Sequence, residues 1–511
     1  MYLTQGLHRS IQATPDAVAT VFRARVRTFS EHALRIARLA GGLRELGVKT
    51  DDRVAILALN SDRYAEYLLA VPWADAVLNP VNIRWSVAEI AYSLNDSDTR
   101  VLLVDDTFVP MLPALRGAVP GLRTIVHCGE SSTPDGTVGY EELAGRGPAV
   151  ADARRGGDAL AGVFYTGGTT GFPKGVMLSH RNLVTSALGT CMTGQLLGPD
   201  SVFLHAAPMF HLADLAGWCG QVLYGGPQVM VPAFQPDAVL AAVQDHRVTD
   251  ILLVPTMIQV LVDHPALGGY DLSSLRRVLY GGSAISEGVL HRTLAALPGV
   301  RLTQAYGMTE LAPVASLLFP DDHRHPRRRT SAGRAAPHAE IGIVTPEGAP
   351  APTGQVGEIR VRGGHTMLGY WNRPEETAQV LRDGWMHTGD AGFLDEDGYL
   401  YVVDRIKDMI ITGGENVYSA EVENALSRHP GVLLCAVVGL PSERWGETVH
   451  ACVVTDPGTD VTAEALTAFL REHIAGYKVP RSIEFVPQLP VSAAGKVLKR
   501  ELRAACLKER Q

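Results

Sequence analysis

The stretch YTGGTTGFPKG at residues 165–175 holds four glycines, three threonines and one lysine in eleven positions. Glycine lets backbone N–H groups turn toward a ligand, and hydroxyls and an ammonium group add further donors, so this composition is typical of a phosphate-binding loop. The common P-loop has lysine followed directly by serine or threonine, whereas here Lys174 follows Phe172 and Pro173 and precedes Gly175. The stretch therefore indicates a phosphate loop of another kind, or a flexible surface turn.

Three further stretches carry groups that suit a nucleotide. QAYGMTE at 304–310 offers an aromatic ring for a base, a hydroxyl for phosphate and a carboxylate for Mg²⁺. HTGD at 387–390 places an aspartate on a turn, where it could accept hydrogen bonds from ribose hydroxyls. PVSAAGK at 490–496 places a lysine on a glycine-containing loop. Each stretch alone is weak evidence, but their order and spacing together indicate one nucleotide site.

The elements that must position these groups follow from the alternation of apolar and polar residues. Short apolar runs alternate with helical patterns over residues 160–310, which predicts a parallel sheet covered by helices with ligands at the carboxyl ends of the strands. Residues 1–160 show a similar, less regular pattern. Residues 340–403 contain short strands with turn signals, which predicts a β-rich subdomain. After 404–408 a compact unit of mixed α and β follows.

Composition excludes several classes of protein. A chain of 511 residues predicts two or more domains, and 46% hydrophobic with 20% charged residues is ordinary for a globular protein. The net charge of −8 gives no general attraction to nucleic acid. The N-terminus lacks the pattern of a secretory signal, and the most apolar stretch, at 251–262, is too short to span a bilayer. We therefore expect a cytoplasmic protein without a nucleic-acid partner or an integral membrane segment.

The six cysteines are scattered, with no C-x-x-C pair and no His/Cys cluster at metal-binding spacing along the chain. This distribution predicts reduced thiols rather than a disulfide framework or a zinc site. The cysteines are Cys128, Cys191, Cys219, Cys435, Cys452 and Cys506.

Characteristic stretches extend over nearly the whole chain: YTGGTTGFPKGVMLSH, PMFH, YGGSAIS, QAYGMTE, GEIRVRG, GYWNRPEET, DGWMHTGD, DRIKDMIITGGENVY and PVSAAGKVLKREL. On these stretches the sequence resembles the adenylate-forming superfamily, and within it the acyl-CoA synthetases such as fatty-acid-CoA and 4-coumarate-CoA ligases. The resemblance implies an α/β fold. A large N-terminal domain of doubly wound sheets plus a β-rich subdomain would cover residues 1–404, and a small mobile α+β domain would cover 405–511, with a hinge at about 404–408.

The resemblance also implies a two-step reaction with ATP, Mg²⁺ and coenzyme A. A carboxylic acid and MgATP give acyl-AMP and pyrophosphate, and a thiol then displaces AMP. The expected partners are the small-molecule acid, ATP and CoA. The sequence is compatible with a homodimer but does not require one.

The first step brings two anions together, so the site must supply positive charge and aligned donors. By resemblance, Thr309 contacts the α-phosphate, Glu310 holds Mg²⁺, and Tyr306 lies against adenine. Lys496 bridges the acid carboxylate and the α-phosphate. The other ATP-binding residues implied are Thr166, Gly167, Gly168, Thr169, Thr170 and Lys174 at the β- and γ-phosphates, the backbone of Gly281, Gly282 and Ser283 beside adenine, and Asp390 and Arg405 at the ribose.

The resemblance assigns roles in the second step as well. His211 matches an aromatic gate beside the carboxylate that moves between the two steps, although a lone histidine at a helix start can also simply pack in the core. Lys407 takes the hinge position. Gly413 and Gly414 would line the tunnel for the pantetheine arm of CoA. Trp445 either borders this tunnel or is a surface aromatic.

Rival classes fit the same residues less well. A peptide-synthetase adenylation domain would carry an aspartate where His211 stands, which argues against an amino acid substrate. A binding protein without catalysis should have lost Lys496, Glu310 or the loop threonines, and none is lost. Luciferase-type oxygenation shares the first half-reaction and remains open. Free CoA is the favoured acceptor, and loading of a carrier protein is a less favoured alternative.

The acid itself is predicted from the residues around its expected pocket. The resemblance places this pocket between the PMFH helix and the strand ends at YGG and YGMTE, and its side chains are apolar and partly small, so the acid should be hydrophobic. A medium- to long-chain fatty acid is favoured, with an aryl or cinnamic-type acid as the alternative. The expected wall consists of Ala213, Ala216, Gly217, Leu279, Tyr280, Ala305, Met308, Leu311 and Ala312.

Overall fold

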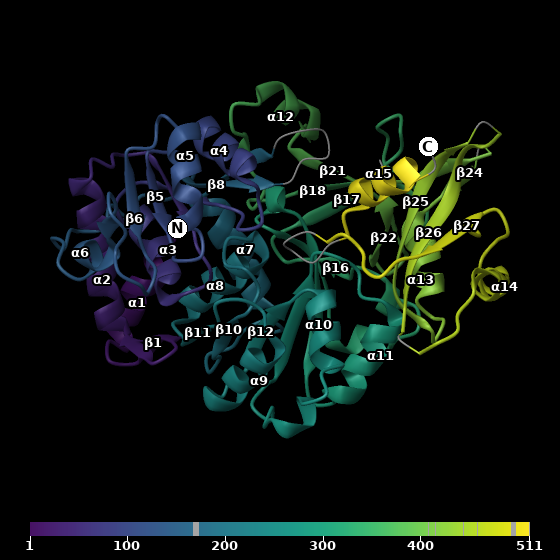
Figure 1. Cartoon of the computed structure of the whole chain (residues 1–511), viewed down its shortest axis with the longest axis horizontal. Coiled ribbons are helices and arrows are strands. Elements are labelled where there is room, and N and C mark those ends of the chain that lie inside the picture. Colours follow the sequence, from purple (N-terminus) through teal and green to yellow (C-terminus); the bar gives the residue numbers. More distant parts are fainter. Residues whose placement is uncertain are drawn as a thin grey trace.

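The structure is a computed structural model that describes residues 1–166, 173–406, 408–413, 415–442, 444–456, 458–491 and 497–509. Two large sheets with helices form the N-terminal body, and the C-terminal residues, yellow-green in Figure 1, lie at one side of it. Within the described residues the strands form four sheets.

The first large sheet has eight strands in the order β19-β9-β8-β4-β3-β5-β6-β7, and its centre is parallel. The outer face of this sheet is covered by α4 and α5, whose leucines pack against those of β3 and β5. The bounds are β3 Arg53–Leu57, β4 Val77–Pro80, β5 Val101–Val104, β6 Thr124–His127, β7 Val138–Gly139, β8 Leu160–Thr166, β9 Lys174–Ser179, β19 Gly369–Tyr370, α4 Val87–Asp96 and α5 Leu112–Ala118.

The second large sheet has nine strands in the order β16-β15-β14-β13-β12-β10-β11-β1-β2, with parallel pairing from β14 to β1. Helices α9, α10 and α11 cover its outer face. The bounds are β1 Val18–Phe22, β2 Arg25–Thr28, β10 Phe203–His205, β11 Gln228–Met230, β12 Asp250–Leu253, β13 Arg277–Gly281, β14 Arg301–Gly307, β15 Val314–Leu318, β16 Arg334–Ala335, α9 Pro236–Asp245, α10 Pro255–Val262 and α11 Glu287–Ala296.

A layer of helices separates the two large sheets. Helix α3 contacts β3 of one sheet and β1 of the other, while α7 and α8 pack together and contact β9 and β10 respectively. Their inward side chains, among them Leu68, Leu183 and Trp218, belong to one large apolar cluster. The bounds of the inner and remaining N-terminal helices are α1 Gln5–Ala13, α2 Phe29–Glu45, α3 Asp62–Trp73, α6 Tyr140–Ala144, α7 His180–Met192, α8 Leu212–Tyr224 and α12 Pro374–Val380.

Two smaller sheets complete the chain. One has the order β17-β18-β21-β20, with β22 on β21, and the other has the order β24-β23-β26-β25, with β27 on β26. The bounds are β17 Glu340–Val344, β18 Gly357–Arg362, β20 Leu381–Arg382, β21 Trp385–Leu394, β22 Leu400–Arg405, β23 Ile410–Thr412, β24 Glu415–Val417, β25 Val432–Ser442, β26 Gly446–Thr455, β27 Ser482–Phe485, α13 Ser419–Leu426, α14 Ala463–His473 and α15 Lys499–Glu509.

The predicted α/β class is confirmed, with one correction to the strand assignment. The strand at 160–166 was grouped with the sheet of residues 160–310, but β8 pairs with β4 and β9 in the other large sheet. The reason is that KGVMLS forms β9 and returns antiparallel to β8, so the chain re-enters the nine-stranded sheet only at β10. In the part of the chain that the structure describes, no helix combines the length and apolarity that crossing a bilayer requires.

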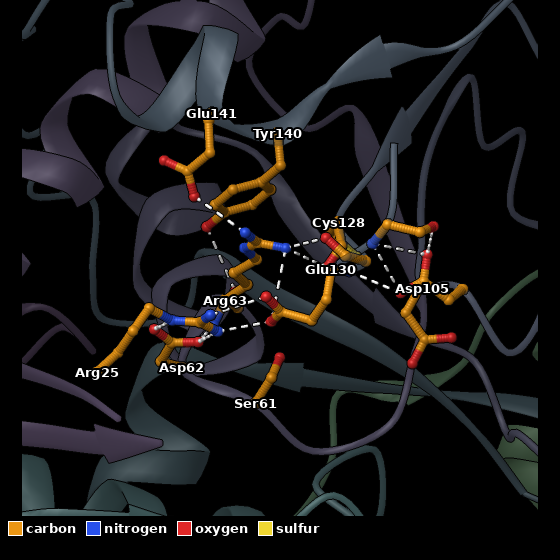
Figure 2. A network of polar contacts seen from close by, with 12 residues as sticks. Arg25, Ser61, Asp62, Arg63, Asp105, Cys128, Glu130, Tyr140 and Glu141 are labelled. Atoms are coloured by element: carbon orange, nitrogen blue, oxygen red, sulfur yellow. Dashed lines mark hydrogen bonds and ion pairs between the residues drawn. The ribbon is translucent and has the colours of Figure 1, made fainter. Parts of the chain in front are cut away.

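A network of charged side chains ties β2 to α3 and to the loop after β6 (Figure 2). The Arg25 guanidinium donates to both carboxylate oxygens of Asp62, over 2.8 and 2.7 Å, and also to Glu130. Arg63 lies 3.3 Å from the Glu141 carboxylate. Because the Asp62 side chain is only 1% exposed, its charge is compensated by these partners rather than by water.

We expect Asp62→Asn to destabilise the fold by about 2 kcal/mol, because it removes the buried carboxylate that accepts from Arg25 and leaves an uncharged amide beside Arg25 and Arg27. Although burial raises the pKa of Asp62, the hydrogen bond and charge of Arg25, with Arg27 and Arg63, hold this pKa below its ordinary value. A lowered pKa contributes stability above the unfolded-state pKa of about 4, and this contribution is lost as the pH falls through the folded pKa. Urea unfolding from pH 7 to pH 3 should therefore show a shallower acid dependence in the variant.

The matched control is Asp271→Asn, which removes the carboxylate from an ion pair with Arg247 in which both side chains are more than half exposed. This substitution should change stability far less than Asp62→Asn does, because exposed ion pairs contribute little to stability. Equal losses in the two variants would show that burial of the Asp62 pair contributes nothing.

Candidate active site

Glu310 lies at the centre of a group of polar side chains. It sits in the short 3-10 turn Thr309–Leu311 directly after β14 and is 6% exposed. The Tyr370 hydroxyl donates to its Oε1 over 2.8 Å, and the Met367 N–H donates to its backbone carbonyl over 2.9 Å. Burial raises the pKa of Glu310, and the hydrogen bond from Tyr370 and the charges of Arg405 and Lys174 oppose this shift.

Lys174 faces the same group from the start of β9. Its ammonium lies 5.2 Å from the centre of the Tyr370 ring and forms an ion pair with Glu376 of α12. Thr166, the last residue of β8, is the register partner of Lys174, so the two ends of the glycine-rich stretch lie side by side. Gly167, Gly168, Thr169 and Thr170 lie outside the described residues.

A second set of contacts joins β14 to the small sheet. The Tyr306 hydroxyl donates to Asp390 Oδ2 over 2.7 Å, and Arg405 Nε lies 3.4 Å from Asp390 Oδ1. Asp390 and Arg405 are direct register partners of β21 and β22. Burial and the neighbouring Asp390 charge raise the pKa of Tyr306 well above its ordinary value, so the phenol stays protonated and acts as the donor.

The predicted adenine-side glycines follow β13. Gly281 pairs with Ala305 of β14, and an added Cβ there would overlap the Ala305 carbonyl oxygen, so only glycine allows this approach of the two strands. Gly282 has a φ of +83°, a conformation that glycine adopts without strain. Gly282 and Ser283 are exposed, and the backbone beyond β13 is therefore accessible to a ligand.

Part of the predicted acyl wall gathers in one apolar cluster. Ala213 of α8, Leu279 of β13 and Ala305 of β14 pack with the buried Phe203 and Ala207. His211 is the N-cap of α8, and its Nδ1 accepts the Ala213 N–H over 3.3 Å. Gly217 lies on the same side of α8, where an added Cβ would overlap the Phe203 ring, so Phe203 already fills the space beside it.

Other residues predicted for this wall lie elsewhere. The prediction that Tyr280 lines the acyl pocket is wrong. Tyr280 follows Leu279 on β13 and therefore faces the outer side of the sheet, under α9 to α11, where its hydroxyl lies 2.8 Å from His323 Nε2. Leu311 is fully buried in the cluster between the large sheets, together with Ala312, and Met308 packs against that cluster. Ala216 is buried on α8.

The residues predicted for the second step are described only in part. Trp445 lies over Gly413: the Gly413 N–H donates to the Trp445 carbonyl over 2.9 Å, and an added Cβ would lie 2.9 Å from the indole. Arg444 and Arg481 lie over the same indole, 4.9 and 4.5 Å from a ring centre. Lys407, Gly414 and Lys496 lie outside the described residues.

Sequence reasoning missed two features of this chain. Tyr370 and Glu376, which hold Glu310 and Lys174, were present in GYWNRPEET but received no role. The six cysteines are free thiols, as predicted, but their spacing along the chain did not indicate that His450, Cys452, Glu484 and Cys506 come together in space. The first two form an H-x-C pair on a strand, where alternate residues share a face, and this was the available signal.

Comparison with known proteins defines the class. The AMP-binding enzyme family matches residues 7–371, and the AMP-binding enzyme C-terminal domain matches residues 421–496. The chain belongs to the AMP-binding enzyme family, and the predicted adenylate-forming class is confirmed.

Individual relatives extend over nearly the full length. The chain is 42% identical over 497 residues to a feruloyl-CoA synthase from Amycolatopsis sp, covering 97% of both chains. It is 37% identical over 508 residues to a fatty acid–[acyl-carrier-protein] ligase from Streptomyces coeruleorubidus, covering 98% of this chain and 96% of the relative. The amide bond synthetase McbA from Marinactinospora thermotolerans has a similar solved structure, with a TM-score of 0.87, 34% identity and coverage of 98% and 99%.

Proposed function

We propose that this chain is an ATP-dependent ligase that activates an aryl or cinnamic-type carboxylic acid as acyl-AMP and transfers it to CoA. The observation that carries the activation step is that Tyr370 contacts both Glu310 and Lys174, which brings a carboxylate and a cation together within an AMP-binding fold. Attack of a carboxylate on a phosphate needs positive charge and a metal ion between anions, and these groups can supply or hold both.

Mg²⁺ fits the donor set around Glu310. A carboxylate oxygen is the ligand that Mg²⁺ prefers, and Mg²⁺ is usually bound by one or two carboxylates together with substrate phosphates. When bound, it would neutralise phosphate charge. Tyr370 orients the Glu310 carboxylate, and Lys174 would add a cation for the β- and γ-phosphates.

Asp390 is the proposed ribose acceptor. Tyr306 and Arg405 fix its carboxylate, so the carboxylate is oriented before the nucleotide binds. We expect Asp390→Asn to raise the KM for ATP about 10- to 100-fold, the value of one or two hydrogen bonds to a charged group. Tyr306→Phe, which keeps the ring but removes one orienting donor, should raise KM less. Steady-state kinetics with varied ATP distinguish these outcomes, and unchanged KM in both variants would remove Asp390 from the nucleotide site.

We choose an aromatic acid because side chains already fill the space beside two glycines of α8, Gly217 and Gly220. Phe203 fills the side of Gly217, and Leu197 and Cys191 fill the side of Gly220, so the cluster beside Ala213 and Leu279 favours a short, flat acid over a long chain. The similarity to the feruloyl-CoA synthase supports the same choice. A medium-chain fatty acid is the second candidate, because the described wall is apolar throughout.

An acid panel tests this proposal. Thioester formation is measured with ferulate, 4-coumarate, benzoate, octanoate and palmitate at saturating ATP and CoA. We expect kcat/KM for the cinnamic acids to exceed that for palmitate at least tenfold, about 1.4 kcal/mol of transition-state binding. A preference for palmitate would contradict the aromatic assignment while leaving the reaction class intact, whereas no pyrophosphate release with any of the acids would contradict the activation step.

A further inference from the structure

Four side chains of metal-binding type meet in the C-terminal part of the chain, far from Glu310 in sequence. His450 and Cys452 lie on β26, Glu484 on β27 and Cys506 on α15, and one ligand atom from each lies within 4.8 Å of all the others. We propose that these residues form a zinc site that fastens α15 to the sheet.

The fold brings the four residues to one face. His450 and Cys452 are two positions apart on β26, so their side chains point to the same side of the sheet. In the parallel register of β26 and β27, Cys452 lies opposite Glu484. Cys506 reaches the same group from α15, because Cys452, Leu502 and Cys506 pack in the apolar cluster between the sheet and α15. Residues separated by up to 56 positions therefore converge, and only His450 and Cys452 are neighbours in the sequence.

The spacing matches the edges of a zinc tetrahedron. With Zn–S bonds of about 2.3 Å and Zn–N or Zn–O bonds of about 2.0 Å, the S···S, S···N and N···O edges are about 3.8, 3.5 and 3.3 Å. The corresponding distances are 3.7 Å between the sulfurs of Cys452 and Cys506, 3.5 Å between Cys452 Sγ and His450 Nε2, and 3.4 Å between His450 Nε2 and Glu484 Oε2.

The surroundings suit a structural ion. Ser482 Oγ lies 2.8 Å from His450 Nδ1, which orients the ring and leaves Nε2 facing the two sulfurs and the carboxylate, as in the outer shell of histidine–metal sites. The His450 side chain is 3% exposed, whereas Glu484 is 35% exposed and opens a path from solvent. Four protein ligands complete the tetrahedron, which is typical of structural rather than catalytic zinc.

Binding has a balanced chemistry. Zinc displaces the two thiol protons of Cys452 and Cys506, which leave to solvent, and no electron is transferred. The two sulfurs are too far apart for a disulfide bond of about 2.0 Å, so the same atoms would have to approach each other to serve as a redox pair. The two explanations therefore predict different thiol counts.

The test uses the full chain, produced without a histidine tag and dialysed against a weak chelator. Elemental mass spectrometry should find about one zinc ion per chain, and cobalt substitution should give a thiolate-to-cobalt charge-transfer band with intense tetrahedral absorption. Cys506→Ser should weaken zinc binding at least about 100-fold. The matched control is Cys435→Ser: this thiol lies in the same part of the chain but contacts the Glu423 carbonyl, outside the cluster, and its loss should leave zinc content unchanged.

Glu484→Gln keeps the test decisive if Cys506→Ser does not fold. This carboxylate is partly exposed, so its replacement should alter the cobalt spectrum without a large packing change. A chain with less than about 0.1 zinc, no cobalt charge-transfer band and six titratable thiols would overturn the proposal. Four titratable thiols with a Cys452–Cys506 disulfide and no zinc would overturn it in favour of a redox pair.

Discussion

Glu310→Gln is expected to slow pyrophosphate release from acid and ATP by at least about 10³-fold. The substitution keeps the size of the side chain and an oxygen that can accept from Tyr370, but it removes the negative charge that the proposed Mg²⁺ site needs. Because Glu310 is buried, water cannot replace the lost ligand with equal orientation. The defect should appear in kcat at saturating ATP, and added MgCl₂ should restore little of it.

Two neighbouring variants serve as controls. Tyr370→Phe removes the hydroxyl that orients Glu310 but keeps the Glu310 carboxylate. Glu376→Gln removes the charge of the ion-pair partner of Lys174, and the side chains of Glu376 and Lys174 are each about one-third exposed. Both should reduce the rate by less than about tenfold, the effect of one neutral or exposed polar contact. If Glu376→Gln slows the first step as much as Glu310→Gln, the metal site lies on α12 rather than after β14.

The sequence predicted the strand ends that carry this chemistry because local patterns determine them. Tyr306 lies near the end of the strand predicted at RLTQAYG and Glu310 lies just after it, and the alternation of strands and helices predicted the parallel sheet. The face of the sheet on which Tyr280 lies could also have been predicted, because neighbouring residues on a strand point to opposite faces and Tyr280 directly follows Leu279 on β13.

Long-range partners could not be predicted from local patterns. The pairing of β8 with β4 depends on contacts across about 80 residues, since Leu78 and Gly162 are register partners. The filling of the Gly217 side by Phe203 depends on how α8 lies on β10. The His450–Cys506 cluster needs a parallel register and a helix from a third segment. Each of these contacts depends on how distant segments pack together, and secondary-structure propensity and hydrophobic periodicity carry no information about that.

Lys496 is proposed to act in only one of the two half-reactions. In the first step a carboxylate approaches a phosphate, so two anions meet and a positioned cation lowers the barrier. In the second step a thiol attacks a neutral acyl carbon, and no second anion approaches the α-phosphate. Val491 and Val497, which stand before and after residues 492–496 in the sequence, form an antiparallel bridge with each other.

Lys496→Ala should therefore slow pyrophosphate release about 10²- to 10³-fold, the usual effect of removing one positioned donor. The same preparation should convert pre-made acyl-AMP and CoA to acyl-CoA at nearly the normal rate. Lys508→Ala is the matched control, because this lysine is exposed on α15 in the same part of the chain and should affect neither step. Measuring both half-reactions on one preparation separates a catalytic loss from misfolding, which would reduce both. If the second half-reaction falls as far as the first while the chain remains folded, the cation serves the thiol step too, and its proposed restriction to adenylation is wrong.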